Sequence, residues 1–282
     1  MGVSLILLFA GGTSLSHITI LGRDLPIYGL LAVLGFIACL LYLLYEAKKY
    51  AFSFDEAFDV FLYAIIGGAI GGKLLYSLQH VQELFQHSDM IFRNFETFTA
   101  YFFSGFVFYG GLIGAITGAF LYARRFHIDI RSYLPYLIPL IPLFHAIARI
   151  GCFLGGCCYG IEMQPPLGIW YHSTAAIPVE AYRFPVQLYE AGGNLVLWCI
   201  LIYMVKRQTD TIHILAGYGC GYAVLRFVLE FLRGDAIRGI YILSTSQWIS
   251  IAILILCVWM LRYKQTALRI FNQEKKEQSL HS

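Results

Sequence analysis

Seven apolar stretches, each long enough to cross a bilayer, constrain this chain more than any other feature. A helix needs about 20 mainly apolar residues to cross the hydrocarbon core. Open strands would leave backbone groups without hydrogen bonds in lipid, so each stretch is predicted to be an α-helix. The predicted spans are residues 26–46, 57–78, 104–123, 132–151, 186–205, 212–232 and 247–263. The sequence therefore predicts an all-α, polytopic membrane protein with seven transmembrane helices.

Few residues of this chain are charged, which excludes an ordinary soluble domain. Only 13% of the 282 residues are Asp, Glu, Lys or Arg, and 59% are hydrophobic. Soluble domains carry about 25% charged residues. No basic run is interleaved with aromatic residues, so we expect no nucleic acid as a partner. We expect a single integral membrane domain over residues 1–282, with a cytoplasmic tail at 269–282.

Basic residues between the spans predict the orientation of the chain. They follow the first, third, fifth and seventh spans, at Lys48-Lys49, Arg124-Arg125, Lys206-Arg207 and from Arg262 onward. Cytoplasmic loops carry such an excess of Lys and Arg, so the N-terminus is predicted outside and the C-terminus in the cytoplasm. The longer connectors, which then lie outside, are 79–103, 152–185 and 233–246. Residues 3–10 are apolar but lack the basic region of a signal peptide, and we interpret them as an interfacial arm.

The charged residues that fall inside the spans or at their edges are Lys73, Arg149, Glu190, Arg226 and Glu230. Charges at this depth are costly, and they mark functional sites by default. Arg226 and Glu230 are four residues apart, so they share a helix face and can pair. Arg149 has no carboxylate within reach on its own helix. Its partner must therefore come from another helix or from a ligand.

These charges also have purely structural interpretations. The Arg226–Glu230 pair would hold helices together, and Glu190, near the start of its span, would complement the helix dipole. The glycines within 67–72 would let two helices pack closely. However, cationic groups outnumber acids in the outer half of the membrane once Arg233 is counted. Because Arg binds phosphate bidentately, we hypothesise a protein that binds an anionic lipid headgroup from its outer side.

Three of the seven cysteines cluster at the outer end of the fourth span: Cys152, Cys157 and Cys158. Their C-x4-C-C spacing is that of neither a zinc ribbon nor a C-x2-C redox pair, so no metal is expected. A metal site would have to recruit His145 and His172 from elsewhere. Three other interpretations remain open. They are a Cys152–Cys157 disulfide on the oxidising side, a thiol made reactive by Arg149, and small residues packed in a glycine-rich turn.

Six short motifs occur in a fixed order along the spans. They are Pro26-Ile27-Tyr28-Gly29, Gly71-Gly72-Lys73-Leu74, Tyr109-Gly110-Gly111-Leu112-Ile113-Gly114, Arg149-Ile150-Gly151-Cys152-Phe153, Pro185-Val186-Gln187-Leu188-Tyr189-Glu190 and Arg226-Phe227-Val228-Leu229-Glu230-Phe231-Leu232-Arg233. This ordered set covers nearly the whole chain and resembles prolipoprotein diacylglyceryl transferases, a family of bacterial membrane enzymes. Departures from the family pattern include four positions that bear on the chemistry. Tyr109 and Phe184 replace His, Cys152 replaces Asn, and Cys157 replaces an acidic residue.

The resemblance implies that the diacylglyceryl group of phosphatidylglycerol is transferred to the lipobox cysteine thiol of prolipoproteins, in the bacterial inner membrane and without a cofactor. The site would stabilise the phosphate leaving group. The residues given catalytic roles are Arg226, Glu230, Tyr109 and Tyr28. Those given substrate-binding roles are Arg149, Lys73, Gln187, Tyr189, Glu190 and Arg233. The implied partners are phosphatidylglycerol, the prolipoprotein signal peptide and the lipid bilayer.

Two alternatives to this function remain open because of the four departures. A related lipid transferase would use a different acceptor, and a non-catalytic protein would only bind anionic lipid. The replacement of His by Tyr109 favours these alternatives, since a tyrosine hydroxyl is a weaker base than histidine at neutral pH.

Overall fold

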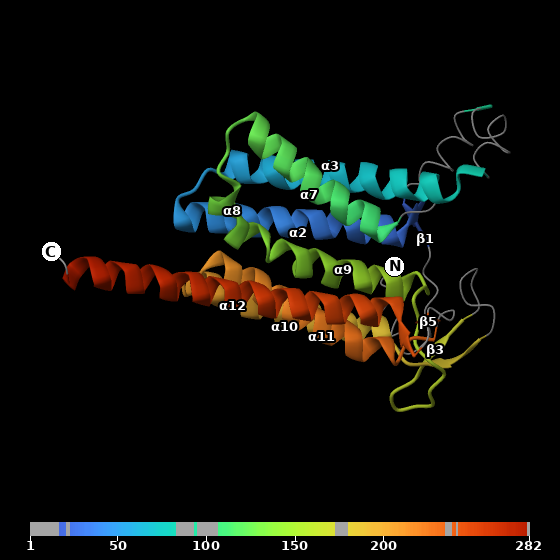
Figure 1. Ribbon diagram of the computed structural model, residues 1–282. Helices are drawn as coiled ribbons and strands as arrows, with labels where there is room; N and C mark the ends of the chain where they lie inside the picture. The colour runs from blue at the N-terminus through green and yellow to red at the C-terminus, as the bar shows by residue number, and fades with distance from the viewer. Residues whose placement is uncertain are drawn as a thin grey trace. The chain divides into compact units, whose positions relative to one another are not determined.

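The computed structural model describes residues 17–20, 23–82, 93–94, 107–172, 180–234, 239–240 and 242–280. Its helices are α2 (Ile27–Tyr50), α3 (Phe54–Gln79), α7 (Phe108–Arg125), α8 (Ile130–Leu137), α9 (Leu140–Leu154), α10 (Val186–Lys206), α11 (Thr211–Glu230) and α12 (Thr245–Leu280). The strands of the described residues form antiparallel pairs: β1 (His17–Ile20) with β2 (Arg23–Pro26), β3 (Ile169–Tyr171) with β4 (Ala181–Arg183), and β5 (Gly239–Ile240) with β6 (Leu243–Ser244). The fold is therefore helical, as predicted (Figure 1).

Six helical segments of the described residues are long and apolar enough to cross a membrane. They are Ile27–Tyr50, Phe54–Gln79, Ile130–Leu154, Val186–Lys206, Thr211–Glu230 and Thr245–Lys264. The third predicted span corresponds to α7, which is not among the six. Its four glycines and terminal Arg124-Arg125 make α7 less apolar than the other spans. The prediction of a multi-pass membrane protein is therefore confirmed, and the seventh membrane span stays a prediction.

Two predicted spans differ from the observed helices in their bounds. The span at 132–151 is two helices, because α8 ends at Leu137 and α9 begins only after Pro139. Proline lacks a backbone N–H and interrupts the helical ladder. By contrast, α12 continues past its predicted end and through most of the expected tail. The arm expected at 3–10 lies outside the described residues.

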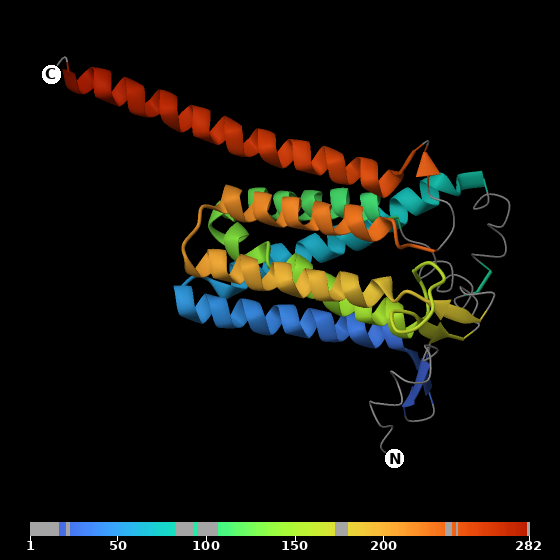
Figure 2. The same ribbon diagram turned by 90° about the horizontal axis from the view of Figure 1, so that it is seen from below.

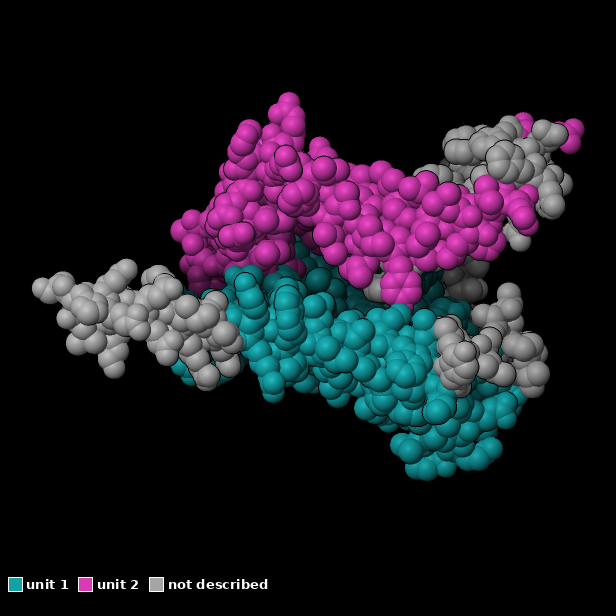
Figure 3. All heavy atoms as spheres, in the orientation of Figure 1, with its two compact units in different colours: residues 1–42, 138–282 teal, residues 43–137 magenta. Residues whose placement is uncertain are grey.

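The chain divides into two compact units, which Figure 3 colours separately. The first comprises residues 1–42 and 138–282, and the second comprises residues 43–137. The boundaries fall inside α2 and directly after α8. The single domain expected over the whole chain stays a prediction.

In the unit of residues 43–137, α3 and α7 lie side by side along a row of glycines (Figure 1). Gly67 and Gly71 of α3 face Gly110, Gly114 and Gly118 of α7. A Cβ atom added at any of these five positions would come closer than 3.0 Å to the backbone of the other helix. The prediction that these glycines permit close helix packing is confirmed for Gly67 and Gly71.

In the other unit, α10 packs between α9 and α11, and α11 packs against α12 (Figures 1 and 2). Leu197 of α10 lies over Gly221 of α11, where an added Cβ would collide with it. At the N-terminal end of α11, Asp210 accepts a hydrogen bond from the N–H of Ile212 at 3.0 Å and pairs with Lys264 of α12. The Lys264 ammonium and this backbone N–H lower the pKa of Asp210.

The polarity of α10 is the reverse of that of a soluble helix. Gln187, Glu190 and Asn194 are completely buried, whereas Val196 and Tyr203 are 59% and 58% exposed. An apolar exterior suits contact with lipid tails, and polar groups inside a membrane helix bundle mark a site. The polar interior of this unit is therefore the candidate functional site.

Candidate active site

A buried carboxylate, that of Glu190, lies at the centre of the charged groups of the larger unit. Arg149 of α9 places its Nε 3.0 Å from Oε2 of Glu190. His145, one turn earlier on α9, places its Nε2 3.5 Å from Oε1 and accepts a hydrogen bond from Arg149 Nε at 3.3 Å. The expectation that Arg149 finds its partner on another helix is therefore confirmed.

Arg226 of α11 reaches the same carboxylate from another side. Its Nη1 lies 3.6 Å from Oε2 of Glu190. Its Nη2 lies 2.6 Å from Oε2 of Glu230, so the predicted pair on one helix face is confirmed. The same Nη2 donates to Ser246 Oγ of α12 at 3.2 Å, and the Tyr222 hydroxyl donates to Oε1 of Glu190 at 3.4 Å. Two guanidinium groups from separate helices thus converge on one carboxylate.

The charges of this network balance. Arg149 and Arg226 carry two positive charges, Glu190 and Glu230 carry two negative ones, and the four side chains are between 1% and 15% exposed. Removing one partner of a buried ion pair costs about 3–5 kcal/mol, because the other charge is left uncompensated. An anionic ligand that binds the guanidinium atoms facing Glu190 therefore has to replace that contact.

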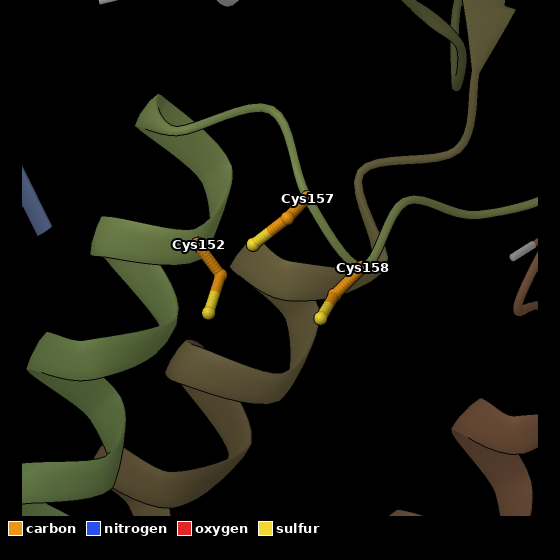
Figure 4. Close-up of side chains that lie close together, drawn as sticks. All are labelled: Cys152, Cys157 and Cys158. Atoms are coloured by element: carbon orange, nitrogen blue, oxygen red, sulfur yellow. The ribbon is translucent and has the colours of Figure 1, made fainter. Parts of the chain in front are cut away.

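The three clustered cysteines, which Figure 4 shows, approach this network at Arg149. Cys152 is in the last turn of α9, and Cys157 and Cys158 are in the loop that follows. All three are free thiols, and their sulfur atoms lie within 4.8 Å of one another. Arg149 Nη1 is 4.0 Å from Sγ of Cys152. Hydrogen bonds from Cys152 and Cys157, and the charges of Arg149 and Arg233, lower the pKa of Cys158.

Two features fix the loop that carries Cys157 and Cys158. Gln187 Nε2 donates to the carbonyl of Cys157 at 2.7 Å, and Gln187 Oε1 accepts from the hydroxyl of Tyr171 at 3.0 Å. Gly156 and Cys158 have φ angles of 66° and 59°, and this left-handed region is uncommon for any residue other than glycine. Both ends of the Gln187 amide are thus used inside the protein, where they position the cysteine loop.

The same loop continues into backbone hydrogen bonds with the segment before α10 and the segment after α11. The N–H of Gly160 donates to the carbonyl of Phe184 at 3.1 Å, and that of Ile161 donates to the carbonyl of Leu232 at 2.9 Å. A Cβ at Gly160 would collide with both carbonyls, so the close approach requires glycine. Gly160 pairs with Arg233 in an antiparallel bridge, which holds Arg233 next to the cysteine loop.

Comparison with known proteins assigns this chain to a family. The sequence model for prolipoprotein diacylglyceryl transferase matches residues 16–263. The chain belongs to this family. Its relatives include the phosphatidylglycerol–prolipoprotein diacylglyceryl transferase of Clostridium tetani, which is 30% identical over 82% of this chain and 90% of the relative. Proteins of that name from Clostridium perfringens and Legionella pneumophila strain Paris are also 30% identical, over 84% and 83% of this chain respectively and 90% of each relative.

Two tyrosines that the transferase resemblance selects lie on the surface of the larger unit. Tyr28 is 53% exposed, and its ring packs against Gly151, where an added Cβ would lie 3.2 Å from Cδ2. Tyr189 is 48% exposed and stacks on Phe184 at 4.5 Å between ring centroids. Phe184 replaces the family histidine, so a ring stack occupies the place of a polar group.

The remaining two predicted residues, Lys73 and Tyr109, belong to the unit of residues 43–137. Lys73 is on α3, with Nζ 4.8 Å from the centroid of the Tyr76 ring. Tyr109 is near the start of α7 and is exposed. Their participation in the active site of this transferase-family protein stays a prediction.

Three residues of the network were not selected from the sequence as members of an ionic site: His145, Tyr222 and Ser246. Two of them carried a usable signal. His145 lies four residues before Arg149, and Tyr222 lies four residues before Arg226, so each shares a helix face with its arginine. Ser246 carried no such signal, because its contact with Arg226 depends on how α12 packs against α11.

Proposed function

We propose that this protein transfers the diacylglyceryl group of phosphatidylglycerol to the thiol of the lipobox cysteine in a prolipoprotein signal peptide. The observation that carries this proposal is the convergence of Arg149 and Arg226 on Glu190. Curated relatives are named for the same lipid donor and protein acceptor. The products are a thioether-linked lipid on the acceptor and glycerol phosphate.

The two arginines act on the phosphate of the lipid. When its phosphodiester enters, its oxygens replace Glu190 as partners of Arg149 and Arg226. As the carbon–oxygen bond breaks, negative charge grows on the leaving phosphate, and guanidinium groups held in place stabilise that charge. Glu190 keeps the guanidinium groups together before the lipid arrives, and Glu230 orients Arg226 at 2.6 Å.

The other expected site residues have supporting roles in this proposal. Tyr28 and Tyr189, both partly exposed residues, are assigned to contacts with the lipid headgroup and the substrate. Arg233 adds positive charge next to the cysteine loop, and Gln187 holds that loop through the Cys157 carbonyl. Tyr109 and Lys73, which the resemblance also selects, belong to the unit of residues 43–137.

The protein is proposed to act in the inner membrane of a bacterium, with seven spans, its N-terminus outside and its C-terminus in the cytoplasm. The basic residues after the first, third, fifth and seventh spans support this orientation. The thiol cluster and the arginine network then lie toward the outer side, because residues 149–160 are predicted at the outer end of the fourth span and Cys152 is in the last turn of α9. Precursor signal peptides are accessible there.

The proposal is tested with the purified full chain in phosphatidylglycerol nanodiscs and a synthetic signal peptide that contains a lipobox cysteine. We expect the peptide mass to rise by one diacylglyceryl group, with release of equimolar glycerol phosphate. Arg226→Ala should lower the transfer rate by about 100-fold, as loss of one transition-state hydrogen-bond donor does. Arg149→Ala should have a similar effect.

The matched control is Arg207→Ala. Arg207 lies in the connector after α10, is exposed, and its Nε donates a hydrogen bond to the hydroxyl of Tyr203. The transfer rate of this variant should equal that of the unaltered protein. If the unaltered protein gave no mass increase, the proposed reaction would be wrong. If both site variants transferred lipid at the rate of Arg207→Ala, the assignment of the phosphate site would be wrong.

A further inference from the structure

The sulfurs of three cysteines lie close enough together to bind one ligand, and the proposed function gives them no role. Cys152, Cys157 and Cys158 come from a helix end and a loop, yet their sulfur atoms all lie within 4.8 Å of one another. Cysteine binds zinc at about 2.3 Å, which separates two sulfurs of a tetrahedral site by about 3.8 Å. A shift of a few tenths of an ångström in each side chain would therefore allow all three sulfurs to bind one ion.

The chain holds these sulfurs in place before any ligand arrives. The N–H of Cys157 donates to the carbonyl of Cys152 at 3.1 Å, which closes the turn at the end of α9. Gln187 holds the carbonyl of Cys157, and Cys158 keeps a left-handed φ of 59° that turns its sulfur toward the other two. Backbone strain at a residue other than glycine persists only where the surroundings impose it. Packing of small residues in a turn does not require this convergence.

Three thiols at one point favour a metal over a disulfide. A disulfide between any two of them would leave the third sulfur unused. Thiolates are ligands for zinc, and catalytic zinc sites have three protein ligands and one open position. The C-x4-C-C spacing by itself did not predict a metal, because the third ligand depends on how the loop folds back on α9.

We propose that Cys152, Cys157 and Cys158 bind one Zn²⁺ ion, and that the open fourth position takes the sulfur of the acceptor cysteine. This inference rests on the proposed transferase function and adds the means by which the acceptor thiol becomes a nucleophile. The family histidine is absent at Tyr109, and the family asparagine and acidic residue are replaced by two of the proposed ligands. The ion supplies the activation that these side chains do not.

The step balances as a nucleophilic substitution. The acceptor thiol binds Zn²⁺ and loses its proton to solvent, which leaves a zinc-bound thiolate. Its sulfur forms a bond to the glyceryl carbon of phosphatidylglycerol, the bond from that carbon to the phosphate oxygen breaks, and the electron pair leaves with glycerol phosphate. The product is a thioether, which is a weaker ligand than a thiolate and dissociates from the ion.

Arg149 connects the metal site with the phosphate site. Its Nε lies 3.0 Å from Glu190, and its Nη1 lies 4.0 Å from the sulfur of Cys152. A phosphate bound to this guanidinium would thus lie close to the metal site, so the glyceryl carbon and the acceptor sulfur at the open position would share one active site. The positive charges of Arg149 and Arg233 would also balance the excess negative charge of several thiolates around one Zn²⁺ ion.

The site is tested first by metal binding alone. The full chain in nanodiscs, kept reduced with a phosphine, is incubated with Zn²⁺ or Co²⁺, desalted and analysed for bound metal. We expect one ion per chain and, with Co²⁺, the charge-transfer absorption of thiolate ligands. Cys152→Ser, Cys157→Ser and Cys158→Ser should each lose the ion, and Cys199→Ser, which removes an exposed thiol of α10, should retain it.

The unaltered protein also gives a test that does not depend on the folding of variants. Adding the acceptor peptide to the Co²⁺ form should increase the charge-transfer absorption by one thiolate, and a peptide with Ser at the lipobox position should not. Absence of bound metal in the unaltered protein would overturn the proposal. A disulfide between two of these three cysteines, mapped by peptide mass spectrometry in protein purified without an oxidant, would also overturn it.

Activity separates the two proposals. Metal-free protein should lose transfer to the peptide and regain it with Zn²⁺. If metal-free and zinc-loaded protein formed the thioether at equal rates, the metal would have no part in the reaction and the transferase function would stand. If zinc-loaded protein bound its ion but formed no thioether, the function would fail and the metal site would stand on the Co²⁺ spectrum.

Discussion

Glu190 is the residue on which the candidate active site depends most. Its carboxylate contacts Arg149, Arg226, His145 and Tyr222, and the residue is buried. Glu190 lies beyond the first turn of α10, so it acts as a buried counter-ion to the two arginines and does not complement the helix dipole. In the free protein this carboxylate pairs with two guanidinium groups. In the proposed reaction a lipid phosphate replaces it as their partner.

Glu190→Gln is expected to lower the free energy of unfolding by about 3 kcal/mol, because it leaves two buried guanidinium groups with too little negative charge. Thermal unfolding in detergent measures this loss. Glu180→Gln is the matched control, since Glu180 pairs with His172 on the surface, where an ion pair contributes about 0–1 kcal/mol. Equal unfolding temperatures for the two variants would show that Glu190 does not hold the network together.

At the scale of elements, the glycine row between α3 and α7 decides how closely two helices approach. Membrane helices gain little from hydrophobic burial against one another, so close packing of small residues is their main source of association. Gly67 and Gly68 are neighbours in α3, but only Gly67 touches the backbone of α7 at Gly114. At Gly68 an added Cβ would make ordinary contacts of 3.4 Å and 3.5 Å.

Gly67→Ala is expected to destabilise the helix pair by about 1–3 kcal/mol, because the added methyl forces the helices apart. Gly68→Ala should be neutral or stabilising, since alanine favours a helix by about 1 kcal/mol over glycine. The thermal unfolding of both variants in the same detergent measures the difference. Destabilisation of Gly68→Ala to the same extent would mean that the two glycines have the same surroundings.

At the scale of the whole molecule, the orientation in the membrane follows from where lysine and arginine lie. We expect green fluorescent protein fused after Ser282 or after Arg125 to fluoresce, because both positions are predicted in the cytoplasm. Alkaline phosphatase fused within residues 79–103 should be active outside the cytoplasm. If the same reporter gave the same signal within residues 79–103 and after Arg125, α7 would not cross the membrane. If alkaline phosphatase fused after Ser282 were active, the predicted orientation of the C-terminus would be wrong.

Helix positions were mostly predictable, because lipid allows few alternatives. Any apolar stretch of sufficient length has to satisfy its backbone internally, and six of the predicted spans match apolar helices of the structure. The break between α8 and α9 was not predicted, although Pro135, Pro139 and Pro142 were visible in the sequence. Apolar length alone predicts one continuous span there. The helix breaks because prolines lack the backbone N–H groups that a continuous helix needs.

The sequence by itself determined the class of the protein, its helices and the charged residues that cannot lie in lipid without partners. The physical reason is local: length, hydropathy and the spacing of four along a helix are properties of one segment. Only the tertiary structure decided that Glu190 joins Arg149 to Arg226, and that three sulfurs meet at one point. Those contacts join residues of different helices and loops, and their distances depend on how α9, α10 and α11 pack, which no single segment specifies.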